Sequence, residues 1–182
     1  MTVWKILSAA ALYTGLAMGA NAADRELPKA LAGMQIHDAP QTVLAAEFEG
    51  PDGAMMTVAD LDGPVTVLNF WATWCAPCVH EMPSLSALQE ASGEDFEVIT
   101  VATGRNTEAG LARFYEQTGI TNLPTYKDPK QMLAREAAVL GLPVTLILDA
   151  EGRELARFQG DADWADQGVI DWLTAMSEDL TN

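Results

Sequence analysis

Apolar positions along the chain follow two alternating patterns. Residues 65–71 form an almost continuous run of β-branched and aromatic side chains, which is typical of a strand buried on both faces of a sheet. Residues 96–102 repeat this pattern and predict a second buried strand. Residues 84–90 and 106–118 instead place apolar side chains at helical spacing. The middle of the chain is therefore expected to alternate strands with helices.

Turn-forming residues precede the first buried strand. Gly-Pro-Asp-Gly at residues 50–53 lies between the short strand-like runs 43–48 and 55–58, which predicts a β-hairpin. Residues 23–41 have a mixed composition. We expect them to form a loosely packed lead-in with one short helix around residues 27–31.

The pattern at the end of the chain predicts a second hairpin and a helix. Residues 143–148 and 153–158 are strand-like and flank the turn sequence Asp-Ala-Glu-Gly. Residues 163–177 have amphipathic helical spacing, which would bury Trp164 and Trp172. Alternating strands and helices that finish in an antiparallel hairpin predict an α/β fold, with a mixed sheet between helices.

The first 22 residues have the features of a secretory signal. One cation, Lys5, precedes an apolar run at residues 6–20, and Ala20-Asn21-Ala22 provides small residues for cleavage. A helix of about 15 residues would be roughly 22 Å long, which is short for ~30 Å of bilayer hydrocarbon. An uncleaved membrane anchor is the alternative. In both cases the domain, expected at residues 42–182, is exported.

The length of the chain indicates its number of domains, and its net charge argues against some classes of function. The 182 residues suggest one structural domain, and 26 acidic against 10 basic residues give a net charge of −16. So negative a chain would repel phosphate backbones and anionic lipid headgroups. Binding to nucleic acid, or to a membrane through a basic patch, is therefore disfavoured.

The only two cysteines form one close pair, Cys75-Ala-Pro-Cys78, between a predicted strand and a predicted helix. A thiolate at a helix amino terminus faces unpaired backbone N–H groups, which lower its pKa and make it nucleophilic. Cys75 is therefore the expected nucleophile. Cys78 lies one turn further along the same side of the helix and can resolve a mixed disulfide. The spacing predicts a reversible dithiol and disulfide switch.

The two cysteines could instead bind a metal or a haem, and the sequence fits these alternatives to different degrees. His37 and His80 are not at zinc-finger spacing, which argues against a structural metal. Covalent haem attachment is excluded because Val79, and not histidine, follows Cys78. A copper(I) carrier stays open because thiolates and the thioether of Met82 are soft ligands.

Residues 69–78, Asn-Phe-Trp-Ala-Thr-Trp-Cys-Ala-Pro-Cys, followed by Glu-Met-Pro at residues 81–83, resemble the TlpA and ResA branch of the thioredoxin superfamily. Gly-Leu-Pro-Val-Thr at residues 141–145 is similar to the cis-proline loop of that family. The resemblance covers roughly residues 42–178. It implies a thioredoxin-like mixed sheet flanked by helices, with an N-terminal β-hairpin and a central helix–strand insert, after which residues 123–126 would form a strand.

The resemblance also implies roles for individual residues. Pro143 would be cis, would face the cysteines and would bind substrate together with Leu142. Trp74, directly before Cys75, is expected to shield the disulfide and to contact substrate. Asn69 stands where thioredoxin has a buried acid, and an asparagine cannot accept a proton. Glu81, three residues after Cys78, is the proposed replacement proton acceptor, and a solvated helix carboxylate is the alternative.

The predicted function is an exported, periplasmic protein thiol-disulfide oxidoreductase that needs no cofactor. The dipeptide Ala76-Pro77 contains no cation to stabilise a Cys75 thiolate, which favours reduction of partner disulfides over oxidation. The resemblance implies a membrane thiol donor of the DsbD or CcdA type, and clients such as apocytochrome c or copper-site assembly proteins. Two alternatives are a copper(I) delivery module that uses Cys75 and Cys78, and an oxidising disulfide donor.

Overall fold

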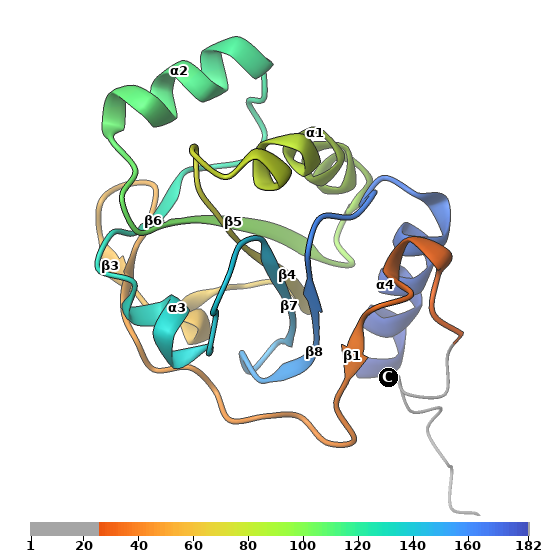
Figure 1. Ribbon diagram of the computed structural model, residues 1–182. Helices are drawn as coiled ribbons and strands as arrows, with labels where there is room; N and C mark the ends of the chain where they lie inside the picture. Colours follow the sequence, from red (N-terminus) through yellow and green to blue (C-terminus); the bar gives the residue numbers. More distant parts are fainter. Residues whose placement is uncertain (1–25, 182) are drawn as a thin grey trace, which may run out of the picture.

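The computed structural model describes residues 26–181, which fold around one eight-stranded sheet (Figure 1). The strand order is β1-β8-β7-β4-β5-β6-β2-β3. The strands are β1 (Gln35–Ile36), β2 (Phe48–Glu49), β3 (Met55–Met56), β4 (Val65–Trp71), β5 (Glu97–Thr103), β6 (Tyr126–Asp128), β7 (Val144–Asp149) and β8 (Glu154–Gln159). The helices are α1 (Ala76–Ala91), α2 (Glu108–Thr118), α3 (Met132–Glu136) and α4 (Gln167–Thr181), with single 3₁₀ turns at Lys29–Leu31 and Val58–Asp60. The predicted mixed sheet flanked by helices is confirmed.

The two runs with the strongest strand pattern form the centre of the sheet. All seven residues of β4 are buried, as expected for a strand covered on both faces. β4 pairs in parallel with β5 and antiparallel with β7. β7 continues into β8 through a turn in which Asp149 accepts hydrogen bonds from the backbone of Glu151 and Arg153. The carboxyl end of β4 is thereby fixed in the middle of the sheet, one short loop before α1.

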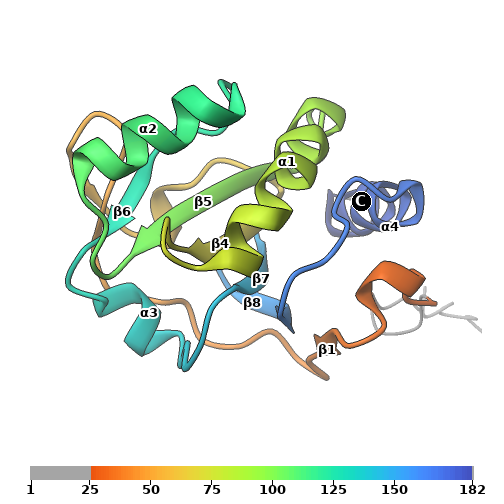
Figure 2. The same cartoon turned by 45° about the horizontal axis from the view of Figure 1, so that its top comes forward.

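Helices cover the sheet on both faces (Figure 2). Side chains of α1, α2 and α4 pack into one apolar core with Val67 and Trp71 of β4. Leu133 and Ala134 of α3 pack into a second core with Leu68 of β4. The side chains of β4 thus alternate between the two cores.

The segment before the first hairpin is more tightly packed than its composition indicates. Leu31 and Met34 are buried in the core beside α4, and β1 pairs with β8 at the edge of the sheet. The expectation of a loosely packed lead-in is therefore wrong for these residues. The apolar side chains are too few to form a periodic pattern, and their burial depends on α4, which is far away in the sequence.

Several predicted boundaries differ from the structure. Only Phe48–Glu49 and Met55–Met56 are extended in the first hairpin, and β6 begins at the last residue of the predicted strand 123–126. The final helix begins at Gln167 and not at residue 163, so Trp164 is buried outside it.

The sequence pattern does not predict α3. This short helix begins because the buried carboxylate of Asp128 accepts hydrogen bonds from the N–H groups of Met132 and Ala134, at 2.8 and 2.9 Å. The side chain of Asp128 thus partners N–H groups that have no partner within the helix.

Among residues 26–181, no helix is both long and apolar enough to cross a bilayer. The predicted signal at residues 1–22 lies outside the described residues and stays a prediction.

Candidate active site

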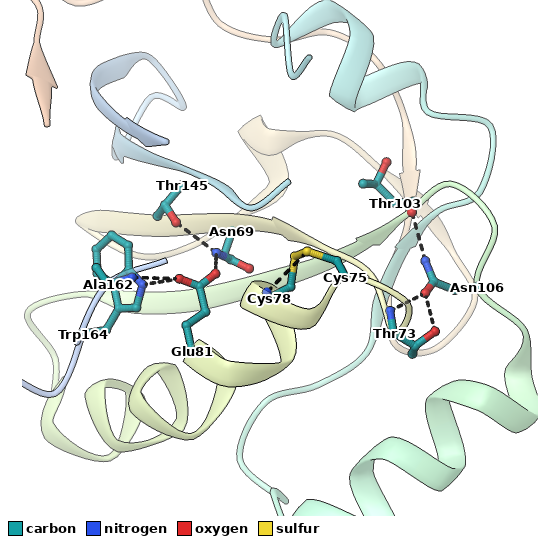
Figure 3. Close-up of a disulfide and its surroundings, with 10 residues drawn as sticks. All are labelled: Asn69, Thr73, Cys75, Cys78, Glu81, Thr103, Asn106, Thr145, Ala162 and Trp164. Atoms are coloured by element: carbon teal, nitrogen blue, oxygen red, sulfur yellow. Dashed lines mark hydrogen bonds between the residues drawn. A yellow bond between two sulfur atoms is a disulfide. The ribbon is translucent and has the colours of Figure 1, made fainter. Parts of the chain in front are cut away.

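A disulfide joins Cys75 and Cys78 at the amino terminus of α1 (Figure 3). Cys75 is the N-cap residue of the helix, and its Sγ accepts a hydrogen bond from the N–H of Cys78 at 3.3 Å. Pro77 lies in the first turn, where its missing N–H would have no intrahelical partner. The pair thus has the position expected from the sequence, with the first sulfur facing helix N–H groups.

The two cysteines differ in their access to solvent. Cys78 is fully buried, whereas 7% of the surface of Cys75 is exposed to solvent. Ala76 and Pro77, which lie between the two cysteines, are exposed. A partner sulfur therefore has a route to Cys75 and none to Cys78. This asymmetry matches the roles of attacking and resolving cysteine.

The loop that leads into Cys75 is held by the loop that follows β5. Asn106 Oδ1 accepts hydrogen bonds from both the N–H and the hydroxyl of Thr73, at 2.8 and 3.0 Å. The indole N–H of Trp74 donates to the carbonyl of Arg105 at 3.0 Å. Asn106 is a site residue that sequence reasoning missed, because nothing in its local pattern points to a contact 33 residues away.

On the exposed side of the disulfide, here called its outer side, Trp74 next to Cys75 lines a hollow whose other lining residues are mostly apolar. Trp74 is 63% exposed and Leu140 is 97% exposed. Both line a hollow of about 220 Å³. Its other lining residues are Thr103, Gln131, Ala134, Val139, Gly141 and Leu142. The Leu142–Pro143 peptide bond at its edge is cis, the isomer that the resemblance implies.

A carboxylate lies on the inner side of the disulfide. Glu81 is 1% exposed. Its Oε1 accepts from the amide of Asn69 at 2.9 Å, and its Oε2 accepts from the indole N–H of Trp164 at 2.9 Å and the N–H of Ala162 at 3.4 Å (Figure 3). The alternative of a solvated helix carboxylate is therefore wrong.

The surroundings of Glu81 change its acidity. Burial raises the pKa of its carboxyl from the ordinary 4.5 to about 7, although the hydrogen bonds from Trp164, Asn69 and Ala162 act in the opposite direction. The charge of Asp161 raises this pKa slightly further. A carboxyl with a pKa near neutrality can gain and lose a proton in each catalytic cycle.

The nearest histidine is directed elsewhere. The His80 side chain is exposed and contacts the carboxylate of Asp161 at 3.2 Å. Within residues 26–181, no group of three or more histidine, cysteine, aspartate or glutamate side chains is arranged to hold a metal ion.

The comparison with protein families gives a direct match. A model described as the AhpC/TSA family matches residues 38–153, which is more than half of the chain. The chain belongs to the AhpC/TSA family. Individual relatives place this AhpC/TSA protein more narrowly.

The thiol:disulfide interchange protein HelX of Rhodobacter capsulatus is 33% identical over 135 residues, covering 74% of this chain and 71% of HelX. The thiol-disulfide oxidoreductase ResA of Bacillus subtilis is 31% identical over 117 residues, covering 64% of this chain and 62% of ResA. The crystal structure of a DsbF homologue from Corynebacterium diphtheriae matches with a TM-score of 0.62 at 27% identity, covering 76% and 91% of the two chains. This AhpC/TSA protein is thus a TlpA/ResA-like thiol-disulfide oxidoreductase with a thioredoxin-like fold.

Proposed function

We propose that this protein reduces disulfide bonds of exported partner proteins through a Cys75–Cys78 dithiol cycle. The observation that carries the proposal is the unequal burial of the two cysteines at the start of α1, with only Cys75 open to a partner. The relatives named as thiol-disulfide interchange proteins support the same chemistry.

The cycle begins with the reduced protein. The thiolate of Cys75 attacks a client disulfide, a Cys75–client disulfide forms, and the first client sulfur leaves as a thiolate that takes up a proton. Cys78 then loses its proton and attacks Cys75 Sγ. The Cys75–Cys78 bond forms, the bond to the client breaks, and the second client sulfur leaves. Two electrons have passed from the protein to the client.

Glu81 is the acceptor for the proton of Cys78 in the second step. It lies on the same side of α1, one turn after Cys78, and is buried beside the disulfide. Its pKa of about 7 lets the carboxylate take the proton and release it at neutral pH. Trp164 and Asn69 hold the two carboxylate oxygens in place.

Trp74, Leu142 and Pro143 bind the client segment around its disulfide. The cis Pro143 has no N–H, so a client strand can approach and pair with the neighbouring backbone. The exposed Trp74 and Leu140 offer apolar surface to side chains next to the client cysteine. Burial of that surface by the client would contribute to affinity.

The charges around the cysteines favour reduction over oxidation. Strong disulfide oxidants stabilise the attacking thiolate with a neighbouring cation or histidine. Here His80, two residues after Cys78 on α1, is exposed and contacts Asp161, and the next residue, Glu81, is acidic. A less stabilised thiolate makes the dithiol a better electron donor.

An exported reductant needs a source of electrons in an oxidising compartment. We infer a periplasmic location from the predicted signal at residues 1–22. A membrane thiol donor of the DsbD or CcdA type would re-reduce the Cys75–Cys78 disulfide. Apocytochrome c and copper-site assembly proteins are the proposed client classes.

The proposal is tested by mixing the reduced protein with a peptide that contains one disulfide and following both partners by mass spectrometry after thiol alkylation. We expect one peptide disulfide to be reduced for each Cys75–Cys78 disulfide formed. Unreacted peptide, together with tight one-to-one binding of copper(I) by the reduced protein, would contradict the proposal and favour the copper delivery module.

A further inference from the structure

Asn69 lies between the two groups that exchange a proton in the proposed cycle. It is fully buried in the middle of β4, directly opposite Thr145 of β7. Its amide nitrogen faces Glu81 and Thr145, while its amide oxygen points away from them, toward the Cys78 side of the disulfide (Figure 3).

The nitrogen of the Asn69 side-chain amide has hydrogen-bond partners, whereas its oxygen has none among the described residues. The nitrogen donates to Glu81 Oε1 and to Thr145 Oγ1, both at 2.9 Å, which uses both of its hydrogens. Within residues 26–181, the buried Oδ1 has no hydrogen-bond partner. An unsatisfied buried acceptor lowers stability, so its presence on the Cys78 side of the disulfide calls for a functional reason.

The charge of Glu81 determines which way the amide faces. An ionised carboxylate only accepts hydrogen bonds, so it requires the NH₂ group of Asn69. A protonated carboxyl has an O–H to donate, and the hydroxyl of Thr145 can either donate or accept. When Glu81 is protonated, an amide turned by half a rotation would therefore satisfy both neighbours with its oxygen. Its NH₂ group would then face Cys78.

Once the disulfide is reduced, the orientation of the Asn69 amide affects the protonation of Cys78. The Cys78 thiol is then a buried titratable group. If the amide oxygen of Asn69 faces Cys78, it can accept a hydrogen bond from the thiol and favours the protonated form. If the amide NH₂ group faces Cys78, it can donate to the sulfur and favours the thiolate. The other ionisable groups near Glu81 and Cys78 are Cys75, the N-cap residue of α1, and Asp161, which contacts His80. Neither Cys75 nor Asp161 is hydrogen-bonded to Asn69.

We propose that Asn69 is a positioning residue that couples the proton on Glu81 to the proton on Cys78 by the orientation of its amide. An ionised Glu81 is then matched with a Cys78 thiol, and a protonated Glu81 with a Cys78 thiolate. The two groups hold one proton between them during resolution. This inference rests on the dithiol cycle proposed above.

The test is a double-mutant cycle in the protein that carries Cys75→Ser, where Cys78 is the only thiol. Its titration is followed by the ultraviolet absorbance of the thiolate. With Asn69 present, we expect Glu81→Gln to lower the proton affinity of Cys78 about tenfold. With Asn69→Leu, which has a similar volume, we expect the same substitution to change it by less than about threefold. An equal change in both backgrounds would overturn the inference.

Thr145→Val serves as the matched control, because it removes a polar group next to Asn69 and leaves the Glu81 contact in place. We expect the tenfold effect of Glu81→Gln to persist in that background. Its loss there would assign the coupling to polarity of the sheet and not to Asn69.

A second measurement leaves Asn69 unchanged, in case Asn69→Leu fails to fold. In the Cys75→Ser protein labelled with ¹⁵N, the side-chain amide signals of Asn69 should move with the titration of Glu81 and stay fixed in Glu81→Gln. Signals that stay fixed while Glu81 titrates would also overturn the inference. Both titrations use no client, so they are independent of whether the protein reduces a peptide disulfide.

Discussion

The outer and inner sides of the Cys75–Cys78 disulfide are built from opposite kinds of side chain. On the outer side, Trp74 and Leu140 present apolar surface to solvent. On the inner side, Glu81, Asn69 and Trp164 are polar or carry a polar group, are almost fully buried, and are joined by hydrogen bonds of 2.9 Å. One disulfide thus separates an apolar, solvent-exposed surface from a buried polar network.

The difference assigns different tasks to the two sides. A partner can cover exposed apolar surface, and removing this surface from water lowers the free energy of the complex. A buried polar network keeps its groups in fixed positions and shifts their pKa values. Substitutions on the outer side should therefore alter which client peptides are reduced. Substitutions on the inner side should alter the stability of the protein and the way its stability depends on pH.

The cysteines themselves should show the largest effect. Cys75→Ser removes the nucleophile, so we expect reduction of a peptide disulfide to fall at least a thousandfold, to the uncatalysed level. Cys78→Ser keeps the nucleophile and should stop at a mixed disulfide with the peptide, visible by non-reducing mass spectrometry. A stable adduct on Cys78 in the Cys75→Ser protein would contradict the assigned order of attack.

On the inner side, Glu81 should make stability depend on pH. The folded protein holds the Glu81 proton more tightly than the unfolded chain does between pH 4.5 and about 7. The free energy of unfolding should therefore fall as pH rises through that window, by about 3 kcal/mol in total. Denaturation of the oxidised protein from pH 4 to pH 8 measures this fall, and Glu81→Gln should remove most of it. A variant with the same pH dependence as the original protein would contradict the assignment.

On the outer side, Leu140→Gln should weaken client binding without changing the disulfide. We expect about tenfold slower reduction of a peptide with leucine or valine next to its cysteine, in line with ~1–1.5 kcal/mol of lost apolar contact. A peptide with serine at that position should be reduced at the original rate. Leu180→Gln, another exposed leucine but on α4, is the control. Equal slowing of both peptides would argue against a role in recognition.

The loop between the two sides should show the smallest effect on rate. Asn106→Ala removes the acceptor for both hydrogen bonds of Thr73, which should cost about 1–3 kcal/mol of stability. We expect a loss of two- to fivefold in the rate of attack by Cys75. Thermal denaturation and stopped-flow fluorescence of Trp74 measure the two effects. An unchanged rate would show that the loop holds its position without Asn106.

The sequence predicts those parts of the molecule that depend on local pattern. β4, β5 and α2 follow from their own apolar spacing, and the position of Cys75 follows from the junction between a strand and a helix. The helical spacing between Cys78 and Glu81 is also local. Where the pattern is strong and the neighbours are close, the prediction and the structure agree.

The remaining features depend on contacts between distant parts of the chain. Trp164 reaches Glu81 across 83 residues, and its sequence position predicts only a buried helix residue. The start of α3 depends on the side chain of Asp128, and the packing of Leu31 depends on α4. Each of these contacts has a clear physical cause in the fold, but none leaves a periodic signal in the sequence.

The reduction potential of the Cys75–Cys78 pair decides whether the protein donates or accepts electrons. The protein is equilibrated in a series of thiol and disulfide buffers, the free thiols are trapped, and the fluorescence of Trp74 gives a second reading. A reductant should have a potential near the ~−270 mV of thioredoxin. A value near the ~−120 mV of a strong oxidant would contradict the account and reverse the direction of electron flow.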